Sequence, residues 1–369
     1  GGGPLTTLLM PDPSSVELPD TLWQRLWLNV LPLRDSQFEA LDPSSDADMQ
    51  ACFPWMGPTR SSEPKKGQAT RPEDAHPLQV YWSMPRRIRL DFDALEDAEC
   101  DLTGKTGPAV RRYHTRNYGP DYAGNWEHPL SPYYQDKQGQ RLPTHPQPGG
   151  LGYRDWSSLT IKQGSDGEPL FAKVVHQLYR QRGLTAKTRL WAFGYDMDNM
   201  KARCWYDASV PVYPIEDSET RENLAAAVEE IIDATEQVAA NLRGQLRKAW
   251  TKPGATASGD ISFIADAFWQ RSASDFYALL DDFVSLYMAE PQAADSEQEA
   301  ALRRAWHKRI HWLSLNLFDA WAMAGDFAFA DPIRISKARK ALGRFNYKTA
   351  IKTALRYRKP ESTPQEDAA

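Results

Sequence analysis

Four long stretches of helix-forming residues fill the C-terminal part of the chain. Within each stretch, apolar residues recur three and four positions apart, the spacing that places them on one face of an α-helix. The stretches are residues 221–250, 260–289, 296–325 and 331–359. Residues that suit helix N-caps or a first helical position stand near the starts of the last three: Asp260, Ser296, Asp331 and Pro332. Long amphipathic helices joined by short loops predict an antiparallel four-helix bundle.

The part before residue 215 is different, because it is rich in Pro, Gly and aromatic residues. Its short apolar runs suit strands at residues 78–82, 87–92, 189–197 and 202–213. Two further segments suit helices, residues 21–31 and residues 168–183. We therefore expect an α+β fold in three parts. They are an irregular mixed α/β N-terminal body (1–215), the bundle (216–360) and a disordered tail (361–369).

Residues 127–156, EHPLSPYYQDKQGQRLPTHPQPGGLGYRDW, form the most irregular segment of the chain. Proline lacks the N–H group that interior helices and central strands need, so this segment is neither. Large rings such as Tyr153 and Trp156 are uncommon in disordered linkers, so we expect it to be ordered. An ordered loop of this length is usually functional.

Composition narrows the class of protein. The 369 residues are 41% hydrophobic and carry a formal net charge of −5, so no overall basic excess points to nucleic acid. Cys52, Cys100 and Cys204 lie far apart, which excludes a disulfide framework and fits a reducing cytoplasm. No apolar stretch is long enough to cross a membrane, and no signal peptide is recognisable. The opening GGGPLTTLLMPDP lacks Met and resembles an interior segment, so we expect that a longer protein extends upstream.

Motifs for catalysis and metal binding are weak. The sequence HKRIH places His307 and His311 one helical turn apart, but Lys308 stands where a metalloprotease needs its general-base Glu. The two histidines are better explained as a polar pair on the surface or as a pair packed against other side chains. Cys100 has Thr103 where a zinc knuckle needs a second thiolate, so a zinc site is not expected. No nucleophile elbow, Walker A loop or dinucleotide fingerprint occurs.

Basic residues are concentrated locally. On the strand predicted at 87–92, Arg87 and Arg89 share one face, and Ile88 and Leu90 share the other. Residues 108–122, PAVRRYHTRNYGPDY, then interleave basic side chains with tyrosines. Such a hairpin can contact phosphates and stack on bases. It can equally be a solvated hairpin whose charges pair with Asp91, Asp93, Glu96 and Glu99.

The last predicted helix is strongly basic, with ten Lys and Arg residues against one Asp. That excess is larger than solubility requires and favours an anionic partner.

Several of these segments, in this order, resemble one family: the large subunit (CasA) of the type I-E CRISPR Cascade complex. The segments are GGGPLTTLL, LWLNVLP, DAHPLQVYWSMPRRIRL, a C-x-x-C-like knuckle, TRNYGPDYAGNWEHPLSPYY, GGLGYRDW and the helical bundle. The resemblance covers nearly all of the chain, and the family's N-terminal portion is missing from it.

The resemblance implies a non-catalytic subunit with no cofactor, no metal and no membrane partner. Such a subunit would recognise a short flanking motif, the PAM, on double-stranded DNA and wedge the duplex open. It would then help hold the displaced strand and recruit a helicase-nuclease. The other implied partners are the crRNA-containing Cascade subunits, namely the backbone, small and Cas5-type subunits. Guide pairing supplies sequence discrimination in such complexes, while the protein reads the flanking motif.

The family's functional positions fall on specific residues of this chain. The duplex-opening wedge maps to the turn between the strand-like LTIK (159–162) and the helix-like segment that follows, at Gln163 flanked by Lys162 and Ser165. The family's lysine finger maps to Glu99, and the nearest lysine is Lys105. Arg111, Arg112, Arg116 and Asn117 are assigned to the same DNA-reading surface. On the last helix, the residues assigned to the displaced strand are Lys337, Arg339, Lys340, Arg344, Lys348 and Lys352.

Two alternatives stay open from the sequence. One is a metal-dependent nuclease that uses His114, His128 and His145 near Asp121 or Asp136. The other is a structural adaptor that meets only protein. In the resemblance, residues 127–156 would brace the DNA-reading hairpins against the body.

Overall fold

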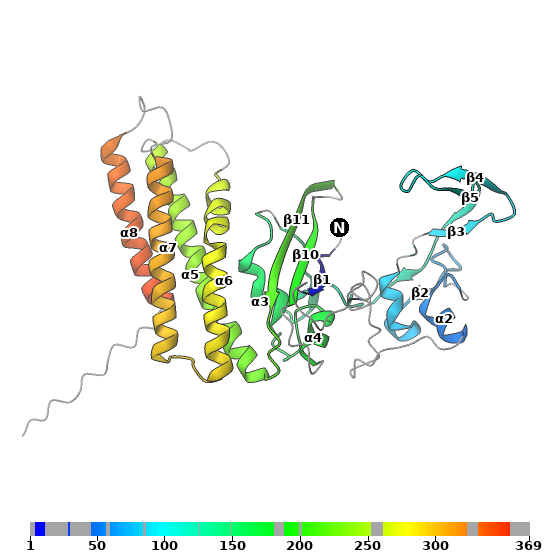
Figure 1. The fold of residues 1–369 in the computed structure, drawn as a ribbon, viewed down its shortest axis with the longest axis horizontal. Coiled ribbons are helices and arrows are strands. Elements are labelled where there is room, and N and C mark those ends of the chain that lie inside the picture. The colour runs from blue at the N-terminus through cyan, green and yellow to red at the C-terminus, as the bar shows by residue number, and fades with distance from the viewer. Residues whose placement is uncertain are drawn as a thin grey trace, which may run out of the picture. The chain divides into compact units, whose positions relative to one another are not determined.

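The chain folds into two compact units (Figure 1). Unit 1 comprises residues 1–18 and 130–369, and unit 2 comprises residues 19–129. The computed structural model describes residues 4–11, 29, 46–56, 60–82, 84, 86–124, 126–147, 149–180, 188–198, 201–251, 261–322 and 331–354. Unit 2 is thus an insertion in the chain of unit 1. The predicted α+β class is confirmed.

Unit 1 contains a three-stranded antiparallel sheet in the order β1-β10-β11. The strands are β1 (Thr6–Pro11), β10 (Thr188–Asp198) and β11 (Lys201–Val212). The two strands predicted at 189–197 and 202–213 are therefore confirmed. One face of the sheet is buried, through Leu9, Leu190 and Val210 among others. This burial follows from the alternation of side chains along a strand.

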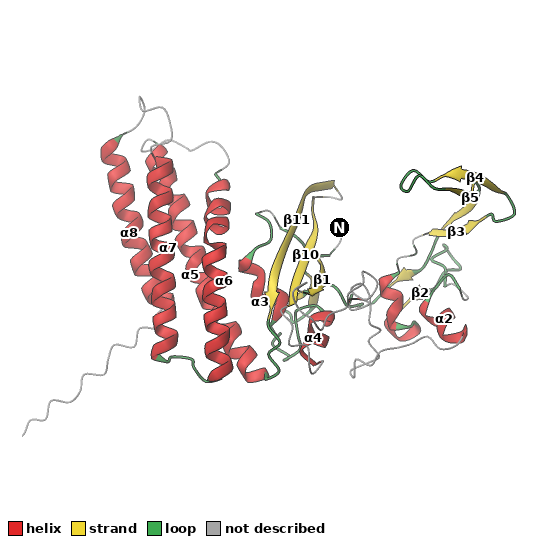
Figure 2. Cartoon of the chain, in the orientation of Figure 1, coloured by secondary structure: helices red, strands yellow, loops and turns green. Residues whose placement is uncertain are grey.

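Four helices follow the sheet: α5 (Ser218–Trp250), α6 (Phe263–Ala289), α7 (Glu297–Ala322) and α8 (Pro332–Ala354). They lie side by side (Figure 2). The Trp250 indole donates to the Trp321 carbonyl, so α5 and α7 end together. The Asn223 side chain, early in α5, donates to the Pro291 carbonyl just beyond α6. Arg334, early in α8, donates to the Ala249 carbonyl late in α5. The helices therefore alternate in direction, as the sequence predicts for an antiparallel bundle.

Two helix starts carry the predicted caps. The Ser296 hydroxyl accepts a hydrogen bond from the Glu299 N–H at 3.1 Å. Asp331 accepts from the N–H groups of Ile333 and Arg334 at 3.0 and 3.1 Å. Asp260, the third predicted cap, lies outside the described residues, and the N-cap of α6 is Ser262, whose side chain forms no capping hydrogen bond.

The proline- and glycine-rich segment is ordered by rings that reach the core. Tyr133, Tyr153 and Trp156 are only 7%, 2% and 0% exposed. The Trp156 indole donates to the Pro211 carbonyl of β11 at 2.8 Å, and the Tyr153 hydroxyl lies 2.8 Å from the Ser272 hydroxyl of α6. The segment therefore joins the sheet to the helices. Its short elements, with α4 after them, are β8 (Tyr133–Gln135), β9 (Arg141–Pro143), η4 (Tyr153–Asp155), α3 (Trp156–Thr160) and α4 (Lys173–Arg180).

Unit 2 combines short helical turns with a long two-stranded ribbon. The strands of the ribbon are β3 (Arg86–Leu90), β4 (Leu95–Glu99), β5 (Thr106–Val110) and β6 (Tyr113–Asn117). The remaining elements are α2 (Asp46–Cys52), β2 (Ala69–Thr70), η2 (Pro72–Asp74), η3 (Pro77–Tyr81) and β7 (Asp121–Tyr122).

Three local predictions need correction. Residues 78–82 were expected to form a strand, but they belong largely to the 3₁₀ helix η3. Residues 159–162 were interpreted as strand-like, but Leu159 and Thr160 close helix α3, which the buried Trp156 anchors. The helix predicted at 168–183 is described only from Lys173 to Arg180. The helix predicted at 21–31 and the tail at 361–369 lie outside the described residues, except for Asn29.

Candidate nucleic-acid interface

Unit 2 contains a largely exposed two-stranded ribbon, residues 86–117, called the ribbon below. Strands β3 and β6 pair in its first half, from Arg86↔Asn117 to Leu90↔Tyr113. Strands β4 and β5 pair in its second half, from Leu95↔Val110 to Glu99↔Thr106. Between the halves, the Asp91 N–H donates to the Arg112 carbonyl at 3.0 Å, so the ribbon is continuous.

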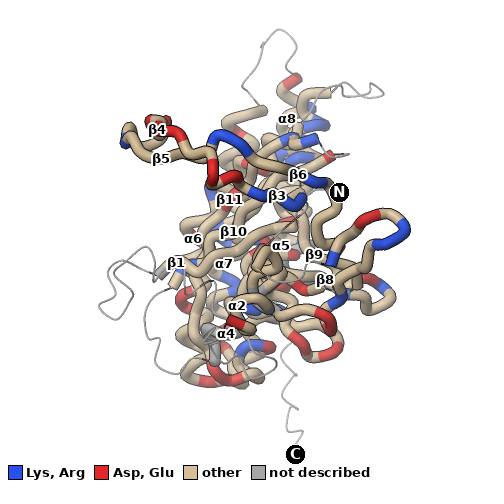
Figure 3. The backbone as a smooth tube through the Cα atoms, turned by 90° about the vertical axis from the view of Figure 1, so that its right-hand side faces the viewer, with Lys and Arg blue, Asp and Glu red and all other residues tan. Residues whose placement is uncertain are grey.

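Charge is separated along the ribbon. Its first half, residues 86–90 and 111–117, contains six arginines and no acid. Its second half, residues 91–110, contains six carboxylates and one lysine. Figure 3 shows basic residues along β3 and β6 and acidic residues near β4. Phosphates are attracted to the first half and repelled by the second.

The pairing register gathers four side chains on one face of the first half, here called the basic face. Arg87 lies opposite Arg116, and Arg89 lies opposite His114. The other face carries Ile88, Leu90 and Tyr113, which are 62%, 45% and 64% exposed, together with Arg86, Thr115 and Asn117. Three exposed apolar side chains and one arginine thus lie opposite the basic face. Of the predicted residues, Arg116 lies on the basic face and Asn117 on the opposite one.

Arg111 and Arg112 lie at the junction of the two halves. The Arg111 guanidinium is 3.3 Å from the Glu96 carboxylate, one of the ion pairs expected of a solvated hairpin. Both side chains are more than half exposed, so this pair contributes little to stability. Arg112 is exposed.

The tip of the ribbon is the turn from Cys100 to Lys105. The Cys100 N–H donates to the Lys105 carbonyl at 2.9 Å, and Gly104 has a positive φ of 65°. The Thr103 hydroxyl hydrogen bond lowers the pKa of the Cys100 thiol. Lys105 stands beside Glu99 and Asp101, so its surroundings are acidic.

The predicted wedge is the turn of residues 162–169 in unit 1, and its first residues are held by helix α5. The Lys162 ammonium lies 2.8 Å from the Glu229 carboxylate. With its amide nitrogen toward α5, Gln163 donates to the Glu222 carboxylate at 3.1 Å. The Ser165 N–H and hydroxyl both donate to the Gln135 side chain, at 2.7 and 3.0 Å. The exposed residues of the turn include Asp166 and Glu168.

Helix α8 carries a basic stripe. At 3.6 residues per turn, Lys337, Lys340, Arg344 and Lys348 lie within about 80° of one another around the helix axis. All four are exposed or partly exposed, and no ion pair to them occurs in the described part of the chain. Arg339 points elsewhere and forms a two-pronged ion pair with Asp319, at 2.6 and 2.8 Å. Lys352 lies within α8, but its side chain is outside the described set.

The histidines do not assemble into a metal site in the residues that the structure describes. His307 and His311 lie on α7 with ring centroids 6.0 Å apart, and burial lowers the pKa of both. His128 packs against the Tyr81 ring, and burial lowers its pKa. His114 belongs to the basic face of the ribbon.

Sequence reasoning did not assign His114 to this surface, although the alternation in YHTRN places it on the same side as Arg116. It also missed a cavity beside α6, described below. The cavity joins residues more than 100 positions apart, which no local pattern reveals.

Comparison with protein families places these features in context. The family model of CRISPR-associated protein Cse1 matches residues 3–317. The chain belongs to the Cse1 family. The resemblance to CasA drawn from the sequence is therefore confirmed. Comparison with curated proteins gave no match.

Solved structures share the fold. CasA of Thermus thermophilus superposes with a TM-score of 0.56 at 13% identity, covering 94% of this chain and 65% of that one. Cse1 of Thermobifida fusca gives a TM-score of 0.55 at 15% identity, covering 94% and 62%. A chain of a CRISPR RNA-guided surveillance complex gives 0.53 at 14% identity, covering 94% and 60%. The chain thus spans less than two thirds of the length of these relatives.

No helix in the described part of the chain combines the length and apolar character needed to cross a membrane.

Proposed function

We propose that this chain acts in the large, non-catalytic subunit of a type I-E CRISPR surveillance complex, where unit 2 contacts duplex DNA next to the target. Membership in the Cse1 family supports the proposal. One observation carries it: the pairing register collects Arg87, Arg89, His114 and Arg116 on the basic face of a solvent-exposed ribbon.

The shape and charge of the ribbon suit this role. Two-stranded ribbons are established readers of DNA grooves, and arginines fix such elements on the phosphates. Because the tip is acidic, we assign DNA contact to the basic face rather than to Lys105. The opposite face, with Ile88, Leu90 and Tyr113, is then free to meet a protein subunit of the complex.

In this proposal, Lys162, Gln163 and Ser165 form the wedge that starts duplex opening. Their contacts with Glu229, Glu222 and Gln135 must first be broken. A side chain inserted between base pairs costs a few kcal/mol of unstacking, which backbone contacts partly offset.

The basic stripe on α8 would hold the displaced strand, because four cations along one helix face can follow a phosphate backbone. The partners are then target DNA, the crRNA-containing subunits and a helicase-nuclease, all in the cytoplasm.

The test is duplex binding by the assembled complex. The double variant Arg89→Ala/Arg116→Ala removes two charges from the basic face. We expect it to weaken binding to duplexes with the flanking motif by about tenfold or more and to reduce the salt slope by about 2.

The matched control is Arg86→Ala/Arg111→Ala, which removes the same charge away from that face. A loss of affinity equal to that of the test variant would mean that only net charge matters. Wild-type affinity in the test variant would reject the proposed interface. A library of duplexes randomised at the flanking positions then identifies the motif.

A further inference from the structure

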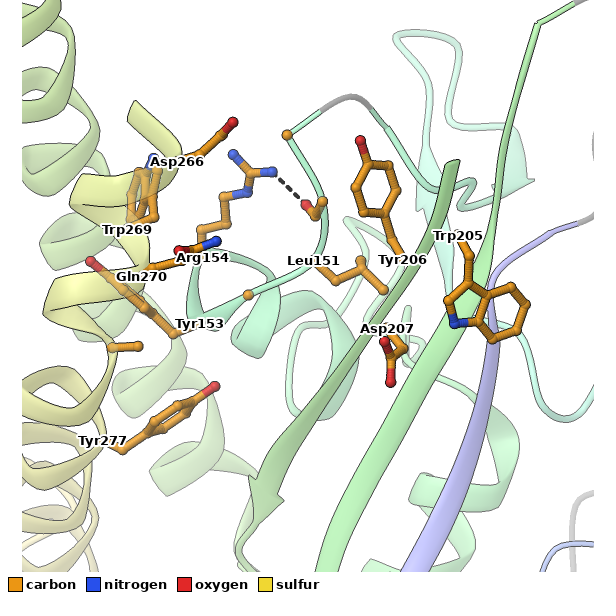
Figure 4. A pocket seen from close by; sticks show the side chains of 14 residues that line it. Leu151, Tyr153, Arg154, Trp205, Tyr206, Asp207, Asp266, Trp269, Gln270 and Tyr277 are labelled. Atoms are coloured by element: carbon orange, nitrogen blue, oxygen red, sulfur yellow. Dashed lines mark hydrogen bonds between the residues drawn. The ribbon is translucent and has the colours of Figure 1, made fainter. Parts of the chain in front are cut away.

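A cavity of about 380 Å³ lies in unit 1, between the sheet and the helices. It is bordered by the loop Gly149–Gly152, by β11 near Tyr206 and by one side of α6. Figure 4 shows Arg154 and Trp269 on the α6 side of this loop and Tyr206 on its β11 side. None of these residues belongs to the interface proposed above.

Aromatic rings line this cavity. The Tyr206 ring lies so close to the loop that a Cβ on Gly150 would be 3.0 Å from it. The Trp269 ring packs against Tyr153 at a centroid distance of 5.0 Å, and the Arg154 guanidinium lies 5.9 Å from the centroid of Trp269. Tyr277 completes the lining from α6, and burial raises its pKa to about 12. Such walls favour a flat, aromatic ligand.

The charged residues that line the cavity are one arginine, Arg154, and two carboxylates, Asp207 and Asp266. Arg154 donates to the Gly150 carbonyl at 2.5 Å and lies 3.8 Å from the Asp155 carboxylate. Asp266 is nearby, because a Cβ on Gly149 would be within 3.6 Å of both its carboxylate and the Arg154 guanidinium. A phosphate group would gain little net electrostatic attraction in this cavity. Donors and acceptors from Arg154, Asp266 and Gln270 instead suit the hydrogen-bonding edge of a nucleobase.

A row of rings on the sheet leads to this cavity. Trp191, Phe193 and Tyr195 alternate along β10, and Trp205 lies opposite Tyr195 on β11. Trp205 is 4.9 Å from Tyr195 and 5.4 Å from Phe193, measured between ring centroids. Tyr195 and Trp205 are 53% and 42% exposed. Unpaired bases stack on exposed rings of this kind. Trp205 also borders the cavity, although its side chain and that of Tyr206 point to opposite faces of β11. The row and the cavity therefore meet at this edge strand of the sheet.

We propose that the cavity takes up one unpaired nucleobase from a single strand that stacks along Trp191, Phe193, Tyr195 and Trp205. The inference rests on the proposed function, since duplex opening is what releases such a strand. It adds a base-binding site on the sheet to the phosphate-binding stripe on α8.

The test uses the purified chain and an eight-nucleotide single strand that carries one 2-aminopurine. Stacking on Tyr and Trp rings quenches this fluorescent base. Tyr206→Leu and Trp205→Leu each remove one ring, and we expect each to weaken binding by about 5- to 100-fold. Tyr206→Phe keeps the ring and should bind like the wild type. Gln270→Ala, at an exposed helix position, should change the preference among bases at the quenched position.

Trp312→Leu is the matched control, because Trp312 is 54% exposed on α7 and is not part of the cavity. It should bind and quench like the wild type. Unchanged affinity in both Tyr206→Leu and Trp205→Leu would overturn the proposal. The proposal would also be overturned if the Tyr206→Leu variant bound the strand normally but failed to assemble into the complex. The cavity would then hold a side chain of a partner subunit.

Failure of this inference and failure of the proposed function give different results. If the ribbon variants weaken duplex binding while the cavity variants bind the strand normally, only the nucleobase site is rejected. If the cavity variants lose the strand while Arg89→Ala/Arg116→Ala keeps full duplex affinity, the duplex interface is rejected and the nucleobase site stands.

Discussion

The Lys162 ammonium lies 2.8 Å from the Glu229 carboxylate of α5, so a cation assigned to the DNA wedge is bound to an acidic helix. Gln163 is held about two helical turns away by Glu222. The turn can therefore act on DNA only after it leaves α5. In the proposed function, a negatively charged duplex would compete with these two carboxylates for Lys162 and Gln163.

Removing the Glu229 charge should release the turn. In Glu229→Gln, we expect faster amide hydrogen exchange in residues 162–169 and a few-fold higher duplex affinity. Stability should change by less than about 0.5 kcal/mol, because both side chains of the pair are more than a third exposed. Glu236→Gln changes the same charge at another exposed position of α5. Equal effects of the two variants would contradict the role of the Lys162–Glu229 pair.

The basic stripe on α8 should be visible in the salt dependence of single-strand binding. Arg344→Ala removes a cation that faces solvent, so the slope of log affinity against log salt should fall by about 1. Arg339→Ala removes a cation that Asp319 already neutralises, and its slope should change much less. Binding of the assembled complex to single strands at several salt concentrations measures both. Identical slopes for the two variants would show that a solvent-facing cation and an ion-paired cation of α8 contribute equally, which contradicts the prediction.

We expect any side chain at Gly150, in the tight loop beside Tyr206, to lower the stability of the fold. Gly150→Ala introduces both a left-handed residue, with φ of 74°, and a Cβ 3.0 Å from the Tyr206 ring. Gly139→Ala introduces only the left-handed residue, with φ of 79° and no atom within 4 Å of the new Cβ. Each should lose about 1–2 kcal/mol for the conformation. Gly150→Ala should lose about 1 kcal/mol more in denaturant unfolding. Equal losses would show that Tyr206 moves freely.

The histidine pair on α7 should make stability depend on pH. Burial lowers the pKa of His307 and His311 in the folded state, so the unfolded chain binds protons first as pH falls. Their contribution to the free energy of unfolding is complete above about pH 6.5 and is lost as pH falls toward their folded-state pKa. His307→Gln/His311→Gln should flatten the loss of stability between about pH 7.5 and 5.5, followed by helical circular dichroism. An equally steep loss of stability in the double variant and the wild type would contradict this prediction.

The helices and the long strands could be predicted because their patterns are local. Apolar spacing identified α5 to α8, and alternation identified β10 and β11. Residues 78–82 show where such patterns fail: LQVYW looks like a strand, yet the prolines at 77 and 85 bracket a short segment, and η3 forms instead. LTIK at 159–162 was misread because the buried Trp156 next to it, anchored on β11, favours helix α3.

The candidate site was only partly accessible from sequence. Arg116 could be assigned to a basic hairpin, but the separation into a cationic half and an acidic half depends on which residues pair across the ribbon. The contact between Lys162 and Glu229 joins positions 67 apart, and the cavity joins the segment at 149–154 with β11 and α6. Tertiary folding alone brings these groups together.

The Thr7 N–H donates to the Leu130 carbonyl at 2.8 Å, although unit 2 is inserted between them in the sequence. The two segments of unit 1 that flank the insertion are therefore hydrogen-bonded directly to each other. Closing a loop becomes costlier only with the logarithm of its length, so the inserted module can grow, shrink or be exchanged at little thermodynamic expense. A ribbon of another length or sequence can then be carried by the same sheet and helices.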